Sequence, residues 1–262
     1  METGLKGRVA IVAGASAGIG RAIALGLAAE GAHVALCARR QDAVEAVAAE
    51  ARTAFGVEAF TQAFDVSDDA AVRAFVAAAH RKFGRIDVCV PNAGGPPAKP
   101  FLATTMEEWE RAWQLNLRSA ISFSHAVLPH MQQQHWGRIV TLTSYTVKQP
   151  VPELVLSNTI RAGVMGLVRS LAGQFGRDGI TVNNVGPGFT ATDRSRSLLE
   201  TRAKNQGTSV EAVQASLEKE IPVGRMATPE EVAAMFVFLA SESAASITGQ
   251  TFLVDGGSYK GL

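Results

Sequence analysis

Three glycines in the run GASAGIG form the first candidate binding site, near the amino terminus of the chain. An apolar, β-branched run precedes them at residues 9–12, and a helix-forming run follows at residues 19–30. Glycines allow a tight turn, and the first turn of a helix presents free N–H groups to an anion. The pattern predicts a site for the pyrophosphate of a dinucleotide, and the alternative is a purely structural turn. The residues predicted to form the site are Gly14, Ser16, Gly18, Ile19 and Gly20.

The end of the second apolar run bears on which dinucleotide could bind. It reads Cys37-Ala38-Arg39-Arg40, so it lacks the acidic residue that would accept hydrogen bonds from both ribose hydroxyls of NAD. A guanidinium can instead form a bidentate, charge-assisted pair with a 2′-phosphate. The sequence therefore favours NADP(H) over NAD(H), with Arg39 and Arg40 as contacts. The alternative is that both arginines are solvated residues at a helix entrance.

Strand-like and helix-like runs alternate along the whole chain. This alternation predicts an α/β fold of the single-domain Rossmann type, a doubly wound parallel sheet of about seven strands with helices on both faces. With no Pro- or Ser-rich linker and no repeat, residues 1–262 are predicted to form one domain. Strands are expected at 9–12, 33–37, 58–64, 87–90, 138–142, 180–185 and 251–254, and helices at 19–30, 42–55, 69–83, 106–134, 159–176 and 229–240.

One polar segment, residues 193–220, interrupts this alternation between the sixth strand and the last helix. Ligand sites in such sheets lie beyond the carboxyl ends of the strands. The segment is therefore predicted to be a substrate lid, and the alternative is a surface excursion. Its basic residues could attract an anionic substrate such as a carrier-bound acyl group, or form a solvated charged face. These residues are Arg194, Arg196, Arg202 and Lys204.

The composition excludes several classes of protein. A formal net charge of +1 argues against nucleic-acid binding by bulk charge. No apolar run approaches the roughly 20 residues of a membrane span, and the opening residues 1–7 lack the apolar core of a secretory signal. Cys37 and Cys89 lie in runs typical of buried strands, which indicates a reducing compartment. We expect a cytoplasmic protein without a metal site, because the five histidines show no ligand spacing.

The G-x-x-x-G-x-G spacing resembles that of the short-chain dehydrogenase/reductase family, and motifs along almost the whole chain agree. The resemblance implies contacts to adenine, an active-site asparagine and contacts on the nicotinamide side of the cofactor. Pro91 stands where the family's N-N-A-G element has its first Asn. The matching residues are Asp65 and Val66 (adenine), Asn92, Ala93 and Gly94 (N-N-A-G), Asn116 (active site), Pro187, Gly188, Thr190 and Thr192 (nicotinamide side) and 254–257 (carboxyl-terminal signature).

The same resemblance indicates where the reacting centre lies and where this chain differs from the family. The family has a Ser after the fifth strand, a Tyr thirteen residues later and a Lys four beyond that. Here these positions hold Ser144, Ser157 and Arg161. In the family, Tyr exchanges a proton with the substrate oxygen, Ser holds that oxygen, and Lys binds the nicotinamide ribose and lowers the pKa of Tyr. The predicted catalytic residues are Asn116, Ser144, Ser157 and Arg161, and Arg161 is also a predicted ribose contact.

The two replacements change what the site can do. A serine hydroxyl is a far poorer proton donor than tyrosine, whose unperturbed pKa is near 10. Arginine keeps its positive charge but does not deliver a proton. Loss of a general acid typically removes about 10²–10⁴ in rate, although positioning and electrostatics remain. Tyr145 and Lys148 could substitute, but Tyr145 follows Ser144 directly, and successive strand residues point to opposite sides. A loop at this point could reverse that orientation.

Three functions remain open at this stage. The leading hypothesis is an NADP(H)-dependent oxidoreductase that moves a hydride between nicotinamide and a small-molecule carbonyl or secondary alcohol, as 3-oxoacyl-carrier reductases do. The second is a catalytically silent dinucleotide-binding sensor or partner subunit, and the third is a non-redox reaction on the same scaffold. Ser157 and Arg161 favour the last two, and the otherwise complete motif set favours the first.

An apolar stripe suggests how copies of the chain could associate. Trp109, Trp113 and Leu117 recur at four-residue spacing on the long helix expected over 106–134. The stripe could belong to the core or to a helix–helix subunit interface. Because the family commonly assembles through this helix, the resemblance implies a homodimer or homotetramer.

Overall fold

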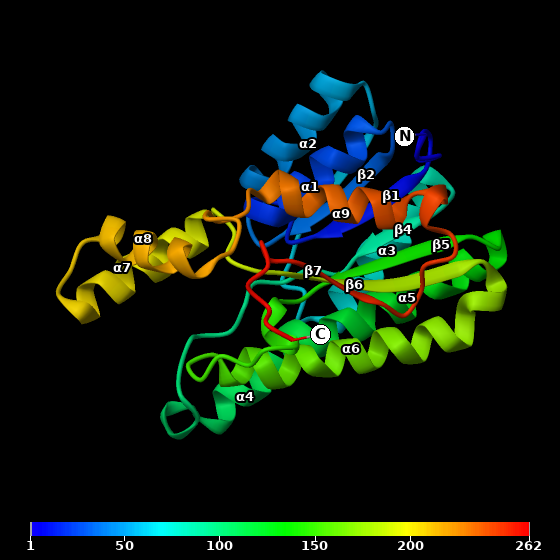
Figure 1. Ribbon diagram of the computed structural model, residues 1–262. Helices are drawn as coiled ribbons and strands as arrows, with labels where there is room; N and C mark the ends of the chain where they lie inside the picture. Colours follow the sequence, from blue (N-terminus) through cyan, green and yellow to red (C-terminus); the bar gives the residue numbers. More distant parts are fainter. Residues whose placement is uncertain (1, 262) are drawn as a thin grey trace.

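Seven parallel strands form one sheet in the computed structural model, which describes residues 2–261 (Figure 1). Their order is β3-β2-β1-β4-β5-β6-β7, and each neighbouring pair is parallel. The chain therefore winds outward from β1 in one direction and then, from β4, in the other. The predicted fold class is confirmed. The strands are Val9–Ala13 (β1), His33–Ala38 (β2), Ala59–Ala63 (β3), Val88–Val90 (β4), Gly137–Leu142 (β5), Ile180–Pro187 (β6) and Thr251–Val254 (β7).

Helices cover both faces of the sheet (Figure 1). One face carries α1, α2 and α9 over one apolar cluster, and the other carries α3, α5 and α6 over a second. Their bounds are Gly18–Ala29 (α1), Gln41–Phe55 (α2), Asp69–Phe83 (α3), Ser119–Gln134 (α5), Val155–Phe175 (α6) and Pro229–Ala240 (α9). Among the described residues, no helix combines the length and the apolar character needed to cross a membrane.

The side chains of β1 alternate between the two apolar clusters. Ala10 and Val12 pack into the cluster under α1, α2 and α9, whereas Ile11 and Ala13 pack into the opposite one. Successive residues of a strand point to opposite faces, so a strand covered on both sides must be apolar throughout. This requirement explains why the strands are recognisable in the sequence as continuous apolar runs.

The long helix expected over residues 106–134 is divided. It consists of α4 (Met106–Ala112), a π-helical turn (Trp113–Arg118) and α5. π-turns inside helices are rare and often occur at functional sites. Helix α6 begins at Val155, four residues before the predicted start, so Ser157 lies in its first turn.

The predicted lid segment contains two helices that the sequence did not indicate. They are α7 (Asp193–Gln206) and α8 (Val210–Glu220), and both lie to one side of the sheet in Figure 1. They share a small apolar cluster separate from the two under the sheet. Its buried members are Leu199, Ala203, Val213, Leu217 and Ile221.

Candidate active site

A cavity of about 820 Å³ lies at the carboxyl ends of the strands. Its walls come from the β1–α1 loop, the loop after β4, the end of β5, the first turns of α6, the end of β6 and α7. This is the position that a doubly wound sheet offers to a ligand. The sequence-predicted residues that line it are Gly14, Gly18, Ile19, Gly20, Asn92, Ala93, Gly94, Ser144, Ser157, Arg161, Pro187, Gly188, Thr190 and Thr192.

The phosphate loop has the geometry that its glycines imply. Gly14 and Gly18 have φ angles of 61° and 53°, in the left-handed region that favours glycine. A β-carbon on Gly20 would lie 2.2 Å from the carbonyl oxygen of Gly14, so only glycine fits there. No side chain caps the start of α1, whose N-cap is Ala17. The first-turn N–H groups of α1 are therefore left for a ligand such as a phosphate.

Some predicted site residues lie outside the lining of this cavity. Arg39 follows β2 and is exposed. Hydrogen bonds from the backbone N–H and the hydroxyl of Ser67 hold the pKa of Asp65 below its usual range, and the charge of Arg39 lowers it further. Asp65 and Arg39 are therefore neighbours at the ends of β3 and β2. The predicted residues outside the lining are Ser16, Arg39, Arg40, Asp65, Val66 and Asn116.

Asn116 lies just behind the cavity, in the π-helical turn. It is 9% exposed, and its Nδ2 donates to the carbonyl oxygens of Gly94 and Ala112, each at 3.4 Å. Gly94 lines the cavity, so Asn116 is linked to the wall through that carbonyl. In the structure Asn116 supports the loop after β4.

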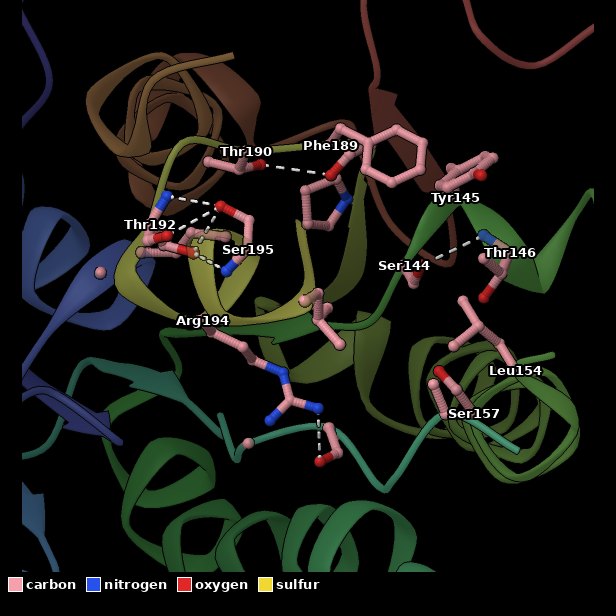
Figure 2. A pocket seen from close by; sticks show the side chains of 18 of the residues that line it. Ser144, Tyr145, Thr146, Leu154, Ser157, Phe189, Thr190, Thr192, Arg194 and Ser195 are labelled. Atoms are coloured by element: carbon pink, nitrogen blue, oxygen red, sulfur yellow. Dashed lines mark hydrogen bonds between the residues drawn. The ribbon is translucent and has the colours of Figure 1, made fainter. Parts of the chain in front are cut away.

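Ser144 and Ser157 both face the cavity, from the segment just after β5 and from the first turn of α6 respectively (Figure 2). The Oγ of Ser144 accepts a hydrogen bond of 3.2 Å from the backbone N–H of Thr146. Because the oxygen acts as acceptor in that bond, the Ser144 hydroxyl proton remains free to be donated to a ligand. The structure thus brings together the two serines predicted for the reacting centre.

Tyr145 also lines the cavity, although the strand alternation predicted that it would point away. A short 3₁₀ turn, Tyr145–Val147, begins immediately after Ser144 and ends that alternation. Figure 2 shows the ring of Tyr145 beside that of Phe189. The two ring centroids are 6.0 Å apart. Burial raises the pKa of Tyr145, which makes its phenol a weaker acid than usual. Its surroundings are those of a packed wall residue.

Arg161 is the most deeply buried cation of the site, at 7% exposure. From α6 its Nη1 donates to the carbonyl oxygen of Thr143 and, at 3.4 Å, to that of Leu142. Within residues 2–261 its Nε has no hydrogen-bond partner. Burial lowers the pKa of Arg161 to about 10, and the charge of Arg194 adds to this effect. The side chain therefore remains a cation at neutral pH.

Arg194 is the functional candidate that the sequence left undecided. It points from the first turn of α7 toward the loop after β4 (Figure 2). There its Nη2 donates to the carbonyl oxygens of Gly95 (2.9 Å) and Pro96 (3.2 Å). Desolvation lowers its pKa. Of the other basic residues in this segment, Arg202 also lines the cavity, whereas Arg196 is exposed and outside the lining. Arg194 and Arg202 therefore lie at the cavity and Arg196 outside it, so these residues do not form one charged face.

Comparisons with known proteins agree with this architecture. The family model described as enoyl-(acyl carrier protein) reductase matches residues 14–259. The 3-oxoacyl-[acyl-carrier-protein] reductase FabG of Escherichia coli (strain K12) is 34% identical over 254 residues, covering 97% of this chain and 98% of FabG. L-sorbose reductase from Gluconobacter frateurii, solved with NADPH and L-sorbose, has a TM-score of 0.96 at 34% identity, with 100% of both chains covered.

A further solved structure is similar over most of the chain. It is an NADPH-bound short-chain oxidoreductase from Pseudomonas aeruginosa PAO1, described as containing an atypical catalytic center. It matches with a TM-score of 0.89 at 35% identity over 97% of this chain and 98% of the other. The predictions of the family and of an oxidoreductase are confirmed by these matches. This chain belongs to the short-chain dehydrogenase/reductase family of oxidoreductases.

Proposed function

We propose that this chain reduces a small-molecule carbonyl, or oxidises the corresponding secondary alcohol, with NADP(H) as its cofactor. The observation that carries the proposal is a single cavity lined by the phosphate loop at one wall and by Ser144, Ser157 and Arg161 at another. Two relatives, L-sorbose reductase and the P. aeruginosa oxidoreductase, hold NADPH in their structures, which supports this cofactor.

The residues present fit a dinucleotide. The uncapped first turn of α1 and the cradle that a β-carbon on Gly20 would fill suit a pyrophosphate. Arg39 and Arg40 would hold the 2′-phosphate, and Arg161 a ribose hydroxyl. When bound, NADPH supplies the hydride. The residues proposed for the nicotinamide side are Pro187, Gly188, Thr190 and Thr192.

The chain's own residues would handle the substrate oxygen. Ser144 donates its hydroxyl proton in a hydrogen bond to that oxygen, which orients the carbonyl. The fixed cation of Arg161 stabilises the negative charge that develops there as the carbonyl is reduced. Ser157 is too weak an acid to complete the reaction, so water supplies the proton. Asn116 contributes indirectly, because it holds the Gly94 carbonyl of the cavity wall.

A two-stage assay tests the proposal. Binding of NADPH is followed by nucleotide fluorescence, and a panel of ketones and aldehydes is then screened for loss of nicotinamide absorbance. We expect saturable binding and slow but measurable oxidation of NADPH by at least one carbonyl. Saturable binding without turnover on any carbonyl would favour the second candidate, a catalytically silent dinucleotide-binding protein. The observation that favours this candidate is Ser157 at the proposed position of the family's tyrosine.

The proposed preference for NADP(H) over NAD(H) depends on Arg39 and has its own test. In Arg39→Gln we expect NADPH affinity to fall about ten- to hundredfold, because a charge-assisted contact to a phosphate contributes about 1.5–3 kcal/mol. NADH affinity should be unchanged, since NADH has no 2′-phosphate, and it serves as the internal control. An equal loss for both nucleotides would mean that Arg39 contacts a part they share.

A further inference from the structure

A second cavity of about 450 Å³ adjoins the one that contains the proposed reacting centre. It lies between the segment after β5 and the helices α7 and α8, and its volume is typical of a small-molecule site. Residues that line only this cavity include Gln149, Val213, Ser216 and Glu220. Six residues line both cavities, which therefore meet along them: Tyr145, Val151, Phe189, Arg202, Gln206 and Leu217.

The boundary between the two cavities has a largely apolar surface. The ring centroids of Tyr145 and Phe189 are 6.0 Å apart, and Figure 2 shows both rings at one side of the first cavity. Tyr145 is the next residue after Ser144, so this boundary begins beside the proposed site of the substrate oxygen. Val151 and Leu217 add further apolar surface. A methylene chain or an aromatic ring would bury apolar area there.

Beyond this boundary the second cavity is polar and carries charges of both signs. Arg202 of α7 and Glu220 of α8 both line it, and within the described part of the chain neither forms a salt bridge. Both charges act on the same phenol, because burial raises the pKa of Tyr145, Arg202 opposes that shift and Glu220 adds to it. Gln206 and Ser216 contribute an amide and a hydroxyl. The cavity therefore offers hydrogen-bond donors and acceptors without a net charge.

We infer that the second cavity binds the remote end of the substrate. The substrates of this chain are then elongated carbonyl compounds, or the matching alcohols, with an apolar middle and an uncharged amide or hydroxyl at the remote end. The inference rests on the proposed function. A guanidinium only donates hydrogen bonds and a carboxylate only accepts them, whereas an amide or a hydroxyl does both. An anionic end would be attracted by Arg202 but repelled by Glu220.

The dinucleotide has its contacts elsewhere. None of the residues proposed to contact the cofactor lines the second cavity. The phosphate loop and the loop after β4 line only the first cavity. The second cavity is instead bounded by α7 and α8, the two helices of the predicted lid. A group held there is therefore assigned to the substrate.

The test varies only the remote end of a ketone. Acetophenones carry at the 4-position a chain of two, four or six methylene groups that ends either in a primary amide or in an isopropyl group of the same shape. Each is titrated calorimetrically into the free protein and into the protein saturated with NADP⁺, which has no hydride to give. At one chain length or more we expect the amide to bind at least about fivefold more tightly than its isopropyl twin, because it hydrogen-bonds to charged partners.

Matched variants of α8 locate the effect. Ser216→Trp fills the second cavity and should remove the preference for the amide. Ala215→Trp places the same side chain on the neighbouring exposed residue, which lines neither cavity, and should keep the preference. Glu220→Gln leaves Arg202 as the single charge of the cavity wall. In that variant the corresponding carboxylic acid should bind about two- to fivefold more tightly than in the parent, as expected for a partly exposed charge.

Each outcome decides the inference. Equal binding of the twins at every chain length, tighter binding of the isopropyl compounds, or a preference that survives Ser216→Trp would overturn it. Loss of the preference in both tryptophan variants would also overturn it, because the effect would not lie in the cavity. Failure of the protein to bind NADP⁺ would contradict the proposed function instead, and the titration of the free protein would still test the second cavity. Both tryptophans replace exposed residues of α8, so the sheet should remain folded.

Discussion

At the scale of single residues, the proposed reacting centre has a cation but no strong proton donor. We propose that Arg161, a buried guanidinium, stands at the family's lysine position and that Ser157, at the cavity wall, stands at its tyrosine position. A guanidinium stabilises charge well but is a poor acid, and a serine hydroxyl is poorer still than a phenol. On this proposal, the chemistry depends on electrostatics and on water for the proton.

Restoring the donor should raise turnover. In the double variant Ser157→Tyr with Arg161→Lys we expect kcat for a neutral ketone to rise by about 10²-fold or more, because a positioned general acid contributes about 10²–10⁴. NADPH oxidation assays at saturating cofactor measure this kcat. Arg161→Lys alone is the control, since it exchanges the cation without adding the phenol and should give a much smaller gain than the double variant. If the double variant binds NADPH and stays as slow as the parent, the proton donor is not what limits this site.

The sequence indicated where the cavity lies but not how its charges are arranged. Glycine spacing and strand ends are local signals, and the structure brings the phosphate loop, Ser144 and Ser157 to one cavity. The juxtaposition of Arg194 with Arg161 depends on how segment 193–220 folds back, which no local pattern encodes. Tyr145 was expected on the other side of the strand, because strand residues alternate. The 3₁₀ turn that reorients it has no clear sequence signature, so the sequence did not predict it.

At the scale of elements, α7 and α8 are held together mainly by their own small cluster. Leu199 and Leu217 are buried there, while most of α7 is polar and exposed. An element with few buried apolar contacts opens locally at low free-energy cost. This supports the interpretation of residues 193–220 as a lid, which stays a prediction.

A single truncation in that cluster should loosen the lid alone. Leu199→Ala removes a buried side chain, for which the typical cost is about 2–5 kcal/mol. We expect faster amide hydrogen exchange throughout α7 and α8 and unchanged protection of β1, β5 and β6. Leu198→Ala is the matched control, because Leu198 is the neighbouring leucine, lines the same cavity and is 42% exposed. Uniform loss of protection across the sheet would show that the lid and the sheet unfold together.

Element boundaries show where sequence patterns are insufficient. The strands and the helices on the sheet were predicted within a few residues because their apolar faces follow from burial on both sides. The helices α7 and α8 were not predicted, because their apolar positions are few and acquire meaning only when the two helices pair. The π-helical turn at Asn116 was also not predicted, although the unusual asparagine inside a helix pointed to a special position.

At the scale of the whole molecule, the two ends of the sheet have different roles. The carboxyl ends carry the cavity with the cations Arg161 and Arg194, whereas the amino ends carry a network of ion pairs.

The residues of the apolar stripe predicted on the long helix lie in different environments. Leu117 packs close to Gly163 of α6, but Trp113 is 37% exposed. Assembly into a homodimer or homotetramer through this helix remains a prediction, and the exposed Trp113 is consistent with it.

The network at the amino ends centres on Asp87, which is fully buried before β4. One carboxylate oxygen accepts from the backbone N–H of Val9 at 2.8 Å and from Arg85 Nε at 2.7 Å. The other accepts from Arg8 at 3.2 Å and from Arg85 Nη2 at 2.6 Å. This carboxylate therefore connects the starts of β1 and β4, at the opposite end of the sheet from the cavity.

Removal of this charge should lower stability without changing the site. Asp87→Asn leaves two cations facing a neutral amide, and breaking a buried pair costs about 3–5 kcal/mol. For a chain of this length we expect Tm to fall by about 6–20 °C, while NADPH affinity at 20 °C below the variant's Tm stays the same. Glu58→Gln is the control, since its pair with Lys82 is exposed and contributes about 0–1 kcal/mol. If Asp87→Asn instead weakens NADPH binding with Tm unchanged, the two ends of the sheet are not independent, and the separation of stability from chemistry along the strands is wrong.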